Sequence, residues 1–251
     1  MKKTLSLLLL LNLLVACGGG KLPEEKPSVD EETSQSETPI SLPSETGSGD
    51  PSQESEESIP PSIASDDCMD EVAQVHYGEN AGFGQAEFPE VVLGPPLGGG
   101  ETTGSTESVL SLGSFGSITL CSETPILNGE GPDFIVFENA FYTELAENGV
   151  FAELATVSVS QDPQGLTGFI NFNCSTYSYK GCAGTHPVLA NAETNSIDPT
   201  DPETAGGDPF DLEVLGLDYA FCVKIEDLDW SALNGGSTAG FDLDAICMVH
   251  Q

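Results

Sequence analysis

Seven carboxylate and amide side chains, each at the start or end of an apolar segment, carry the chemistry that this sequence could perform. They are Asp133, Glu138, Asn139, Asp208, Asp211, Asp242 and Asp244. Calcium in proteins takes six to eight oxygen ligands from carboxylates, amides and backbone carbonyls. The seven residues therefore predict at least one calcium site, although no EF-hand loop is present.

The last two acids, Asp242 and Asp244, alternate with apolar residues in the segment Gly240–Ile246. In an extended strand, alternate side chains point to the same face. The two carboxylates would repel each other there unless they were exposed, protonated or bridged by a cation. Glu138 and Asn139 would complete such a metal shell if their strand lies beside the last strand of the chain.

A purely local role is the alternative for each acid, and the sequence leaves it open. Asx side chains are common in turns and as helix N-caps. The local roles would be turn residues for Asp133 and Asp208, an N-cap ahead of Leu212–Leu215 for Asp211, and a solvated strand face for Asp242 and Asp244.

Short strands must position these residues, because helical periodicity is scarce and strand signals are common. In residues 155–160 apolar and hydroxyl side chains alternate strictly, and in residues 219–226 Tyr, Phe, Val and Ile alternate with smaller or charged residues. Further strands are expected at 72–77, 117–121, 134–137, 168–172 and 245–249. Gly and Pro clusters separate them, and the connection 183–216 is long and rich in Asp, Pro and Gly. The pattern predicts an all-β, antiparallel β-sandwich whose strands each have one solvent-exposed face.

Cysteines indicate an oxidising compartment. Six of the seven lie in the second part of the chain, at Cys68, Cys121, Cys174, Cys182, Cys222 and Cys247. An even number in an exported domain predicts three disulfides, with fifteen possible pairings. Cys174 and Cys182 are the pair expected first, since they are close together in a polar loop.

The net charge narrows the range of partners. The formal charge is −35, with 41 Asp and Glu residues against six basic residues. Only Lys180 and Lys224 are basic beyond residue 67, apart from histidine. Such a surface argues against binding nucleic acid or anionic lipid head groups, and it leaves carboxylates free for a hard cation.

The N-terminus carries an export signal. Lys2 and Lys3 precede a leucine-rich run that ends in Leu14-Val15-Ala16-Cys17. A basic start, a short apolar stretch and small residues at a cleavage point are typical of a signal peptide, and the run is too short to span a membrane. The end of the run resembles the lipobox of bacterial lipoproteins, in which the cysteine (here Cys17) is acylated and becomes the new N-terminus. Gly18, where that class often carries a retention aspartate, favours the outer membrane or cell surface within the cell envelope.

Three regions follow from these patterns. Residues 1–16 are the signal peptide, and residues 17–67 are a lipidated cysteine and an acidic linker rich in Ser, Glu and Pro, expected to be disordered. Residues 68–251 are the sandwich domain.

Motifs in the third region resemble a family of bacterial cell-surface proteins of uncharacterised function. They are Gly131-Pro132-Asp133-Phe134 with Val136-Phe137-Glu138-Asn139, then Gly206-Gly207-Asp208 with Phe210-Asp211-Leu212, then Gly240-Phe241-Asp242-Leu243-Asp244-Ala245. The family is similar to galactose-binding-like jelly rolls, the class of discoidin domains and carbohydrate-binding modules. The resemblance implies an exported jelly roll, often with a structural calcium and a sugar site.

No catalytic signature accompanies these motifs. The sequence has no nucleophile elbow, zinc-binding helix or phosphate loop. Of the three histidines only His186 lies in a plausible site loop, and it is expected to be structural. Trp230 could stack on a sugar ring or cover the core. We expect a lipid-anchored, calcium-assisted binding module for glycan or protein rather than an enzyme. The alternatives are a secreted hydrolase that uses acids such as Glu138 and Asp242, and an envelope protein without a specific ligand.

Overall fold

The computed structural model describes residues 67–144, 149–229 and 240–251, all within one compact unit, Glu56–Gln251. Nearly every element in these ranges is a strand. The elements are β1 (Glu71–His76), η2 (Glu90–Val92), β2 (Leu110–Ser111), β3 (Ser117–Leu127), β4 (Phe134–Phe137), β5 (Phe141–Tyr142), β6 (Val150–Phe151), β7 (Ala155–Ser160), β8 (Ile170–Asn171), β9 (Cys182–Ala183), β10 (Asp208–Phe210), η3 (Leu212–Leu215), β11 (Tyr219–Asp227), β12 (Asp242–Leu243) and β13 (Ala245–Met248).

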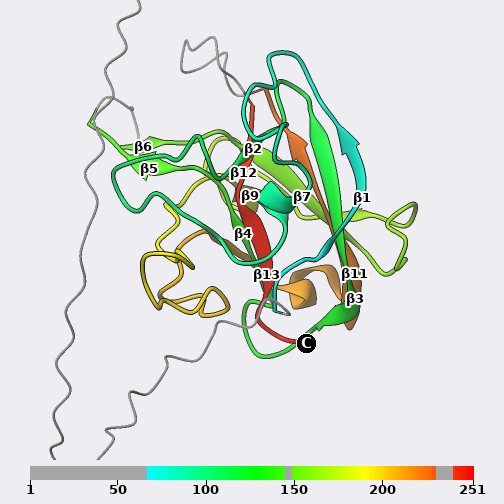
Figure 1. The fold of residues 1–251 in the computed structure, drawn as a ribbon. Coiled ribbons are helices and arrows are strands. Elements are labelled where there is room, and N and C mark those ends of the chain that lie inside the picture. The colour runs from blue at the N-terminus through cyan, green and yellow to red at the C-terminus, as the bar shows by residue number, and fades with distance from the viewer. Residues whose placement is uncertain (1–66, 145–148, 230–239) are drawn as a thin grey trace, which may run out of the picture. The chain divides into compact units, whose positions relative to one another are not determined.

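Two antiparallel sheets form the body of the fold (Figure 1). The larger has the order β1-β3-β11-β7-β8, with β9 also paired to β7, and the smaller has the order β10-β4-β13. Side chains from both sheets share one core, because β4 and β13 bury Phe134 and Ile246 in the same cluster as Leu120 of β3 and Val223 of β11. The prediction of an all-β antiparallel sandwich is confirmed.

Strand β4 is buried on both faces, which explains its uninterrupted apolar sequence. Phe134 and Val136 point into the core between the sheets. Ile135 and Phe137 pack on the other side against Val188 and further residues, Ala190 and Ala205, of the connection from β9 to β10. Residues 188–205 of the long connection therefore pack over the smaller sheet, and the same connection also supplies β10 to that sheet and contains η3.

The alternation of two strands differs from the sequence-based expectation. The face of β7 that carries the hydroxyl groups is not exposed to solvent. Ser158 and Ser160 are buried, and the Ser160 hydroxyl donates to the Thr167 carbonyl at 2.6 Å. In β11 the pairing with β3 shifts between Ala220 and Cys222. A bulge changes which face a side chain takes, so Ala220 is buried while Tyr219 is exposed.

All six cysteines beyond residue 67 form disulfides, as predicted. The pairs are Cys68–Cys247, Cys121–Cys222 and Cys174–Cys182. The first ties the beginning of the folded region to its last strand, and the second joins β3 to β11. The third closes the polar loop, which confirms the pairing expected from the sequence.

The N-terminal predictions fall on residues that the structure does not describe. The signal peptide, Cys17 and nearly all of the linker lie outside the described residues, and so does Trp230. None of the helices in the described ranges has the length and apolarity needed to cross a membrane.

Candidate functional site

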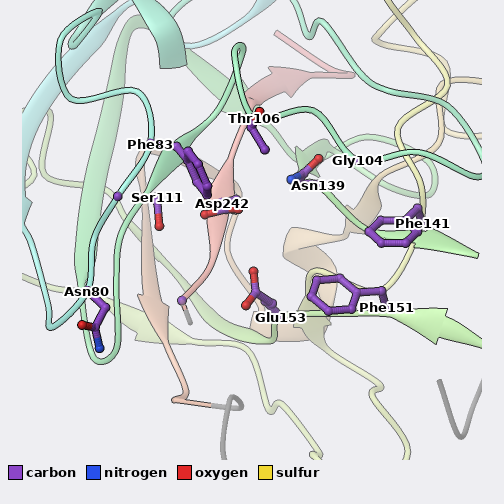
Figure 2. A pocket seen from close by; sticks show the side chains of 12 residues that line it. Asn80, Phe83, Gly104, Thr106, Ser111, Asn139, Phe141, Phe151, Glu153 and Asp242 are labelled. Atoms are coloured by element: carbon purple, nitrogen blue, oxygen red, sulfur yellow. The ribbon is translucent and has the colours of Figure 1, made fainter. Parts of the chain in front are cut away.

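A pocket of about 320 Å³ opens where two short antiparallel strand pairs, β2–β12 and β5–β6, meet the end of β4 (Figure 2). Acidic, amide and aromatic side chains line it together. The lining residues used below are Phe83, Ser111, Asn139, Phe141, Phe151, Glu153 and Asp242. Ligand sites for small molecules are commonly concave and combine apolar walls with a few polar groups.

The last strands of the chain bring two predicted residues to this pocket. β13 pairs with β4, with Ala245 opposite Phe137, so the segment that precedes β13 lies beside the residues that follow β4. β12 pairs with β2, which places Asp242 opposite Ser111. The condition set by the sequence is thus met: the strand that carries Glu138 and Asn139 does lie beside the last strand.

Glu153 is the pocket acid that the sequence did not single out. It follows β6, two residues beyond Phe151, and precedes β7. Figure 2 shows its carboxylate directed into the same space as that of Asp242. In the sequence it belongs to Phe151-Ala152-Glu153, one of the motifs of the family resemblance, but neither that motif nor its place before the alternating strand 155–160 shows that it would face Asp242.

Burial and neighbouring carboxylates, including Asp227, disfavour ionisation of Glu138, Glu153 and Asp242. Burial raises the pKa of Glu138 well above its usual value, and the charges of Glu153 and Asp242 raise it further. Burial, and then the charge of Asp242, raises the pKa of Glu153 to about 8. Burial also raises the pKa of Asp242 to about 6, although hydrogen bonds from Ser111 and Asn139 lower it.

Two buried oxygen atoms at this place have no hydrogen-bond partner. They are Oε2 of Glu138 and Oδ1 of Asp242, on residues that are 2% and 6% exposed. A buried polar atom without a partner costs roughly 1–3 kcal/mol, and more if it is charged. Neither ion pair of the described residues, His186–Asp208 or Lys224–Glu226, includes these carboxylates. The arrangement therefore lacks a positive charge.

The three acids have the right chemistry to bind a cation, but their side chains do not converge on one point. Unpartnered carboxylate oxygens are the ligands that calcium prefers. However, within 67–144, 149–229 and 240–251, no group of three or more His, Cys, Asp or Glu side chains is placed to hold a metal ion. Asn139 is also partly engaged, because its Oδ1 accepts a hydrogen bond from the Ser105 amide.

Asp133 and Asp211 have the local roles that the sequence left open. The fully buried Asp133 accepts hydrogen bonds from the amides of Gly129 and Leu212, both at 2.7 Å, and so holds the turn before β4 to the start of η3. Asp211 caps η3 by accepting from the Glu213 amide at 2.8 Å. Neither residue lines the pocket.

Asp244 lies away from the pocket lining, although it is only two residues from Asp242. Both of its oxygens accept from the Leu97 amide, at 3.0 and 3.1 Å. Burial raises its pKa to about 7, and the bond from Leu97 lowers it. Both acids are buried, so the alternative of a solvated strand face is wrong.

Asp208 is saturated with hydrogen bonds on the other side of the β5–β6 hairpin. Its Oδ2 accepts from the amides of Gly184 and Thr185, at 2.7 and 2.8 Å. Its Oδ1 accepts from the Thr185 hydroxyl and lies 2.7 Å from Nδ1 of His186. The hydrogen bond to Asp208 raises the pKa of His186, although burial lowers it. Asp208 thus fixes the orientation of the His186 ring. His186 lines a separate hollow of about 290 Å³, which Tyr142 also lines.

The structure thus gathers three of the seven predicted residues, Glu138, Asn139 and Asp242, and adds Glu153. It places Asp133, Asp208, Asp211 and Asp244 elsewhere, each with protein donors. No model of a known protein family matches the chain, and no curated protein matches it. The family resemblance of its motifs stays a prediction.

Proposed function

We propose that this protein is a lipid-anchored cell-surface binding module whose pocket at Glu153 and Asp242 takes a glycan with the help of calcium. One observation supports the proposal most: the unpartnered, buried Oδ1 belongs to Asp242, which lines a pocket with aromatic side chains, and a second unpartnered oxygen lies behind it on Glu138, whose pKa the charge of Asp242 raises. A rigid sandwich that carries a small polar and aromatic pocket is a binding architecture.

Calcium would neutralise the charge that the chain itself leaves unbalanced. Glu138, Glu153 and Asp242 are the carboxylates that would hold it, and Asn139 and Ser111 keep Asp242 in place. This set replaces the wider set that the sequence predicted. Because no three acidic side chains of the described residues converge on one point, calcium binding would require these side chains to rearrange.

A glycan is the ligand class that the walls favour over a protein. Phe83, Phe141 and Phe151 line the pocket together with the acids, with Phe83 beside Asp242 and Phe151 beside Glu153 (Figure 2), and rings of this kind stack on the apolar face of a sugar. The volume of about 320 Å³ is at the lower end of the range for small-molecule sites. A flat protein partner would require a larger surface.

The proposed location depends on the N-terminus. An acylated Cys17 would hold the protein at the outer membrane or cell surface, and the three disulfides agree with an oxidising compartment. Mass spectrometry of the N-terminal peptide should find acyl groups on Cys17. An unprocessed, unacylated N-terminus in the cytosolic fraction would refute this part of the proposal.

A calcium titration of the melting temperature tests the metal. With the affinity typical of extracellular modules, a Kd of about 0.1–1 mM, 1 mM calcium adds roughly 0.4–1.4 kcal/mol. For a domain of this size that is a rise of roughly 1–6 °C. Asp242→Asn should abolish the rise, whereas the matched control Asp244→Asn, a buried acid outside the pocket, should retain it. Identical melting of the unaltered protein in calcium and in chelator would remove calcium from the proposal.

A second candidate, a carboxylate-dependent hydrolase, uses the same pocket. The pKa of Glu153 is raised to about 8 and that of Asp242 to about 6, so near pH 7 one is an acid and the other a base. Glycosidases need such a pair. Turnover of a glycoside panel, lost in both Glu153→Gln and Asp242→Asn, would favour this candidate over a binding module. Silence in both the binding and the turnover assays would leave an envelope protein without a specific ligand.

A further inference from the structure

One buried carboxylate oxygen at the pocket needs a hydrogen-bond donor. Asp242 is 6% exposed and lines the pocket, and its Oδ1 has no hydrogen-bond partner among the described residues. Its other oxygen accepts from the side chains of Ser111 and Asn139. Leaving a buried acceptor unpaired is costly, so a ligand that donates to Oδ1 would gain a bond that the folded chain does not make.

The charge of the pocket favours a cationic donor. Glu153 lines the pocket as well, and Figure 2 shows its carboxylate and that of Asp242 directed into the same space. Neither ion pair of the described residues includes these two acids. The whole chain carries a formal net charge of −35, and a potential of this sign concentrates cations in an acidic hollow.

An ammonium group suits the observed positions of these acids better than a metal ion does. In the parts of the chain that the structure describes, no three His, Cys, Asp or Glu side chains are placed to hold a metal. A primary ammonium carries three separate N–H donors, so its acceptors need not converge on one point. A guanidinium donates best to both oxygens of one carboxylate, and Asp242 has only one oxygen open.

The aromatic side chains provide a surface for the rest of such a ligand. Phe83 lies beside Asp242 and Phe151 beside Glu153 (Figure 2). Phe141 and Phe151 are paired across the β5–β6 hairpin, with ring centroids 5.0 Å apart and planes inclined by 17°. All three rings are half-buried, so part of their surface remains for a ligand. Aromatic rings attract a cation held over their faces, and they also pack against an alkyl chain.

We propose that the pocket binds the ammonium group of a primary alkylamine, which donates to Oδ1 of Asp242 and to Glu153 while its alkyl chain packs on the neighbouring phenylalanine rings. The inference goes beyond the proposed function, because it requires neither calcium nor a glycan. Free alkylamines and the side chain of lysine carry the same aminobutyl group, so both sources share this chemistry.

Isothermal titration of the purified full-length protein, in detergent micelles at pH 7.5 with EDTA, tests the proposal. The probe is n-butylamine, which should bind at one equivalent. Two matched probes each lack one property: n-butanol has no charge, and butyltrimethylammonium has no N–H. Each should bind about tenfold more weakly or worse, the range for one hydrogen bond to a charged group. Nα-acetyl-L-lysine methylamide is titrated in parallel, and the tighter of the two amines identifies the source.

Four variants locate the site. Asp242→Asn should weaken n-butylamine binding about tenfold or more, whereas Asp244→Asn, which removes a buried acid outside the pocket, should not change it. Phe151→Ala should weaken binding by roughly 2- to 30-fold, the range for one cation–π contact. Tyr142→Ala, on the same hairpin but lining the hollow beside His186, should leave it unchanged.

Three results would overturn the inference. They are no binding of either amine, equal binding of n-butanol and n-butylamine, and binding at several equivalents that Asp242→Asn does not weaken, which would be a general effect of the net charge. Repeating the n-butylamine titration in 1 mM calcium separates this inference from the proposed function. Amine binding that calcium leaves unchanged would uphold the ammonium site and remove calcium from this pocket.

Discussion

Raising the pH from 5 to 8 in the presence of a chelator should destabilise this protein. Asp242 and Asp244 have pKa values of about 6 and 7 in the folded protein, because burial disfavours their charged forms. In the unfolded chain both ionise near pH 4. Between these limits the folded protein binds more protons, so stability is lost as the pH rises through about 6 to 7.

The size of the loss follows from the pKa shifts. For Asp242 the shift from 3.8 to about 6 corresponds to roughly 3 kcal/mol at about 1.4 kcal/mol per unit. The shift of Asp244 from 3.8 to about 7 corresponds to roughly 4 kcal/mol. A domain of this size melts about 2–4 °C lower for each kcal/mol lost. Part of each loss occurs between pH 4 and 5, so from pH 5 to 8 about one unit remains for Asp242 and about two units for Asp244, roughly 1.4 and 2.8 kcal/mol. Asp242 alone thus predicts a fall of roughly 3–6 °C over this range.

Thermal melting at pH 5, 6, 7 and 8 measures this effect, in chelator and then in 1 mM calcium. Calcium should stabilise most at pH 8, where the acids of the pocket are ionised, and least at pH 5. Asp242→Asn and Asp244→Asn should each flatten the pH dependence in chelator, because asparagine cannot ionise. Only Asp244→Asn should still respond to calcium.

A melting temperature in chelator that stays constant or rises between pH 5 and 8 would refute the reasoning. It would show that the buried carboxyls are already neutralised or solvated. A calcium response of equal size at pH 5 and pH 8 would show that the bound ion does not depend on the ionised acids.

Three further predictions concern the fold. Phe134→Ala should cost about 3–5 kcal/mol in chemical denaturation, since the ring is fully buried and stacks on Phe210 at 5.2 Å; a loss below 1 kcal/mol would contradict this packing. Asp133→Ala should cost about 2–6 kcal/mol because it leaves two amides unpaired, and Asp211→Ala, which removes one exposed cap, only about 1 kcal/mol. Removing the disulfide between β3 and β11, with a sequence separation of 101, should cost about 2 kcal/mol more than removing the one with a separation of 8; equal losses would argue against the loop-entropy account.

The sequence predicted the sandwich because its signals are local. Strict alternation in residues 155–160 and the apolar run Phe134–Phe137 each gave a strand with the observed bounds. Six cysteines in an export context predicted three disulfides, and the Asp before Leu212–Leu215 proved to be its N-cap. Each of these features is determined by neighbours along the chain or by composition.

Burial and pairing between distant segments decided the rest. The face of β7 that was expected to be exposed to solvent is covered by the segment that follows the strand. The bulge in β11 appears only in its pairing with β3. The acids of the chain look alike in sequence, yet Asp133 also accepts from the Leu212 amide, 79 residues away, and Asp208 accepts from the Gly184 amide, 24 residues away.

The pocket itself belongs to the tertiary structure. The sequence only set the condition that the strand before Glu138 and Asn139 lie beside the last strand, and the pairing of β13 with β4 meets it. Only the folded chain sets Glu153 across from Asp242 and turns Phe141 and Phe151 toward them. The physical reason is that a carboxylate acquires a function from what surrounds it, and here its surroundings come from five stretches of the chain, 80–83, 104–111, 139–141, 151–153 and 240–242.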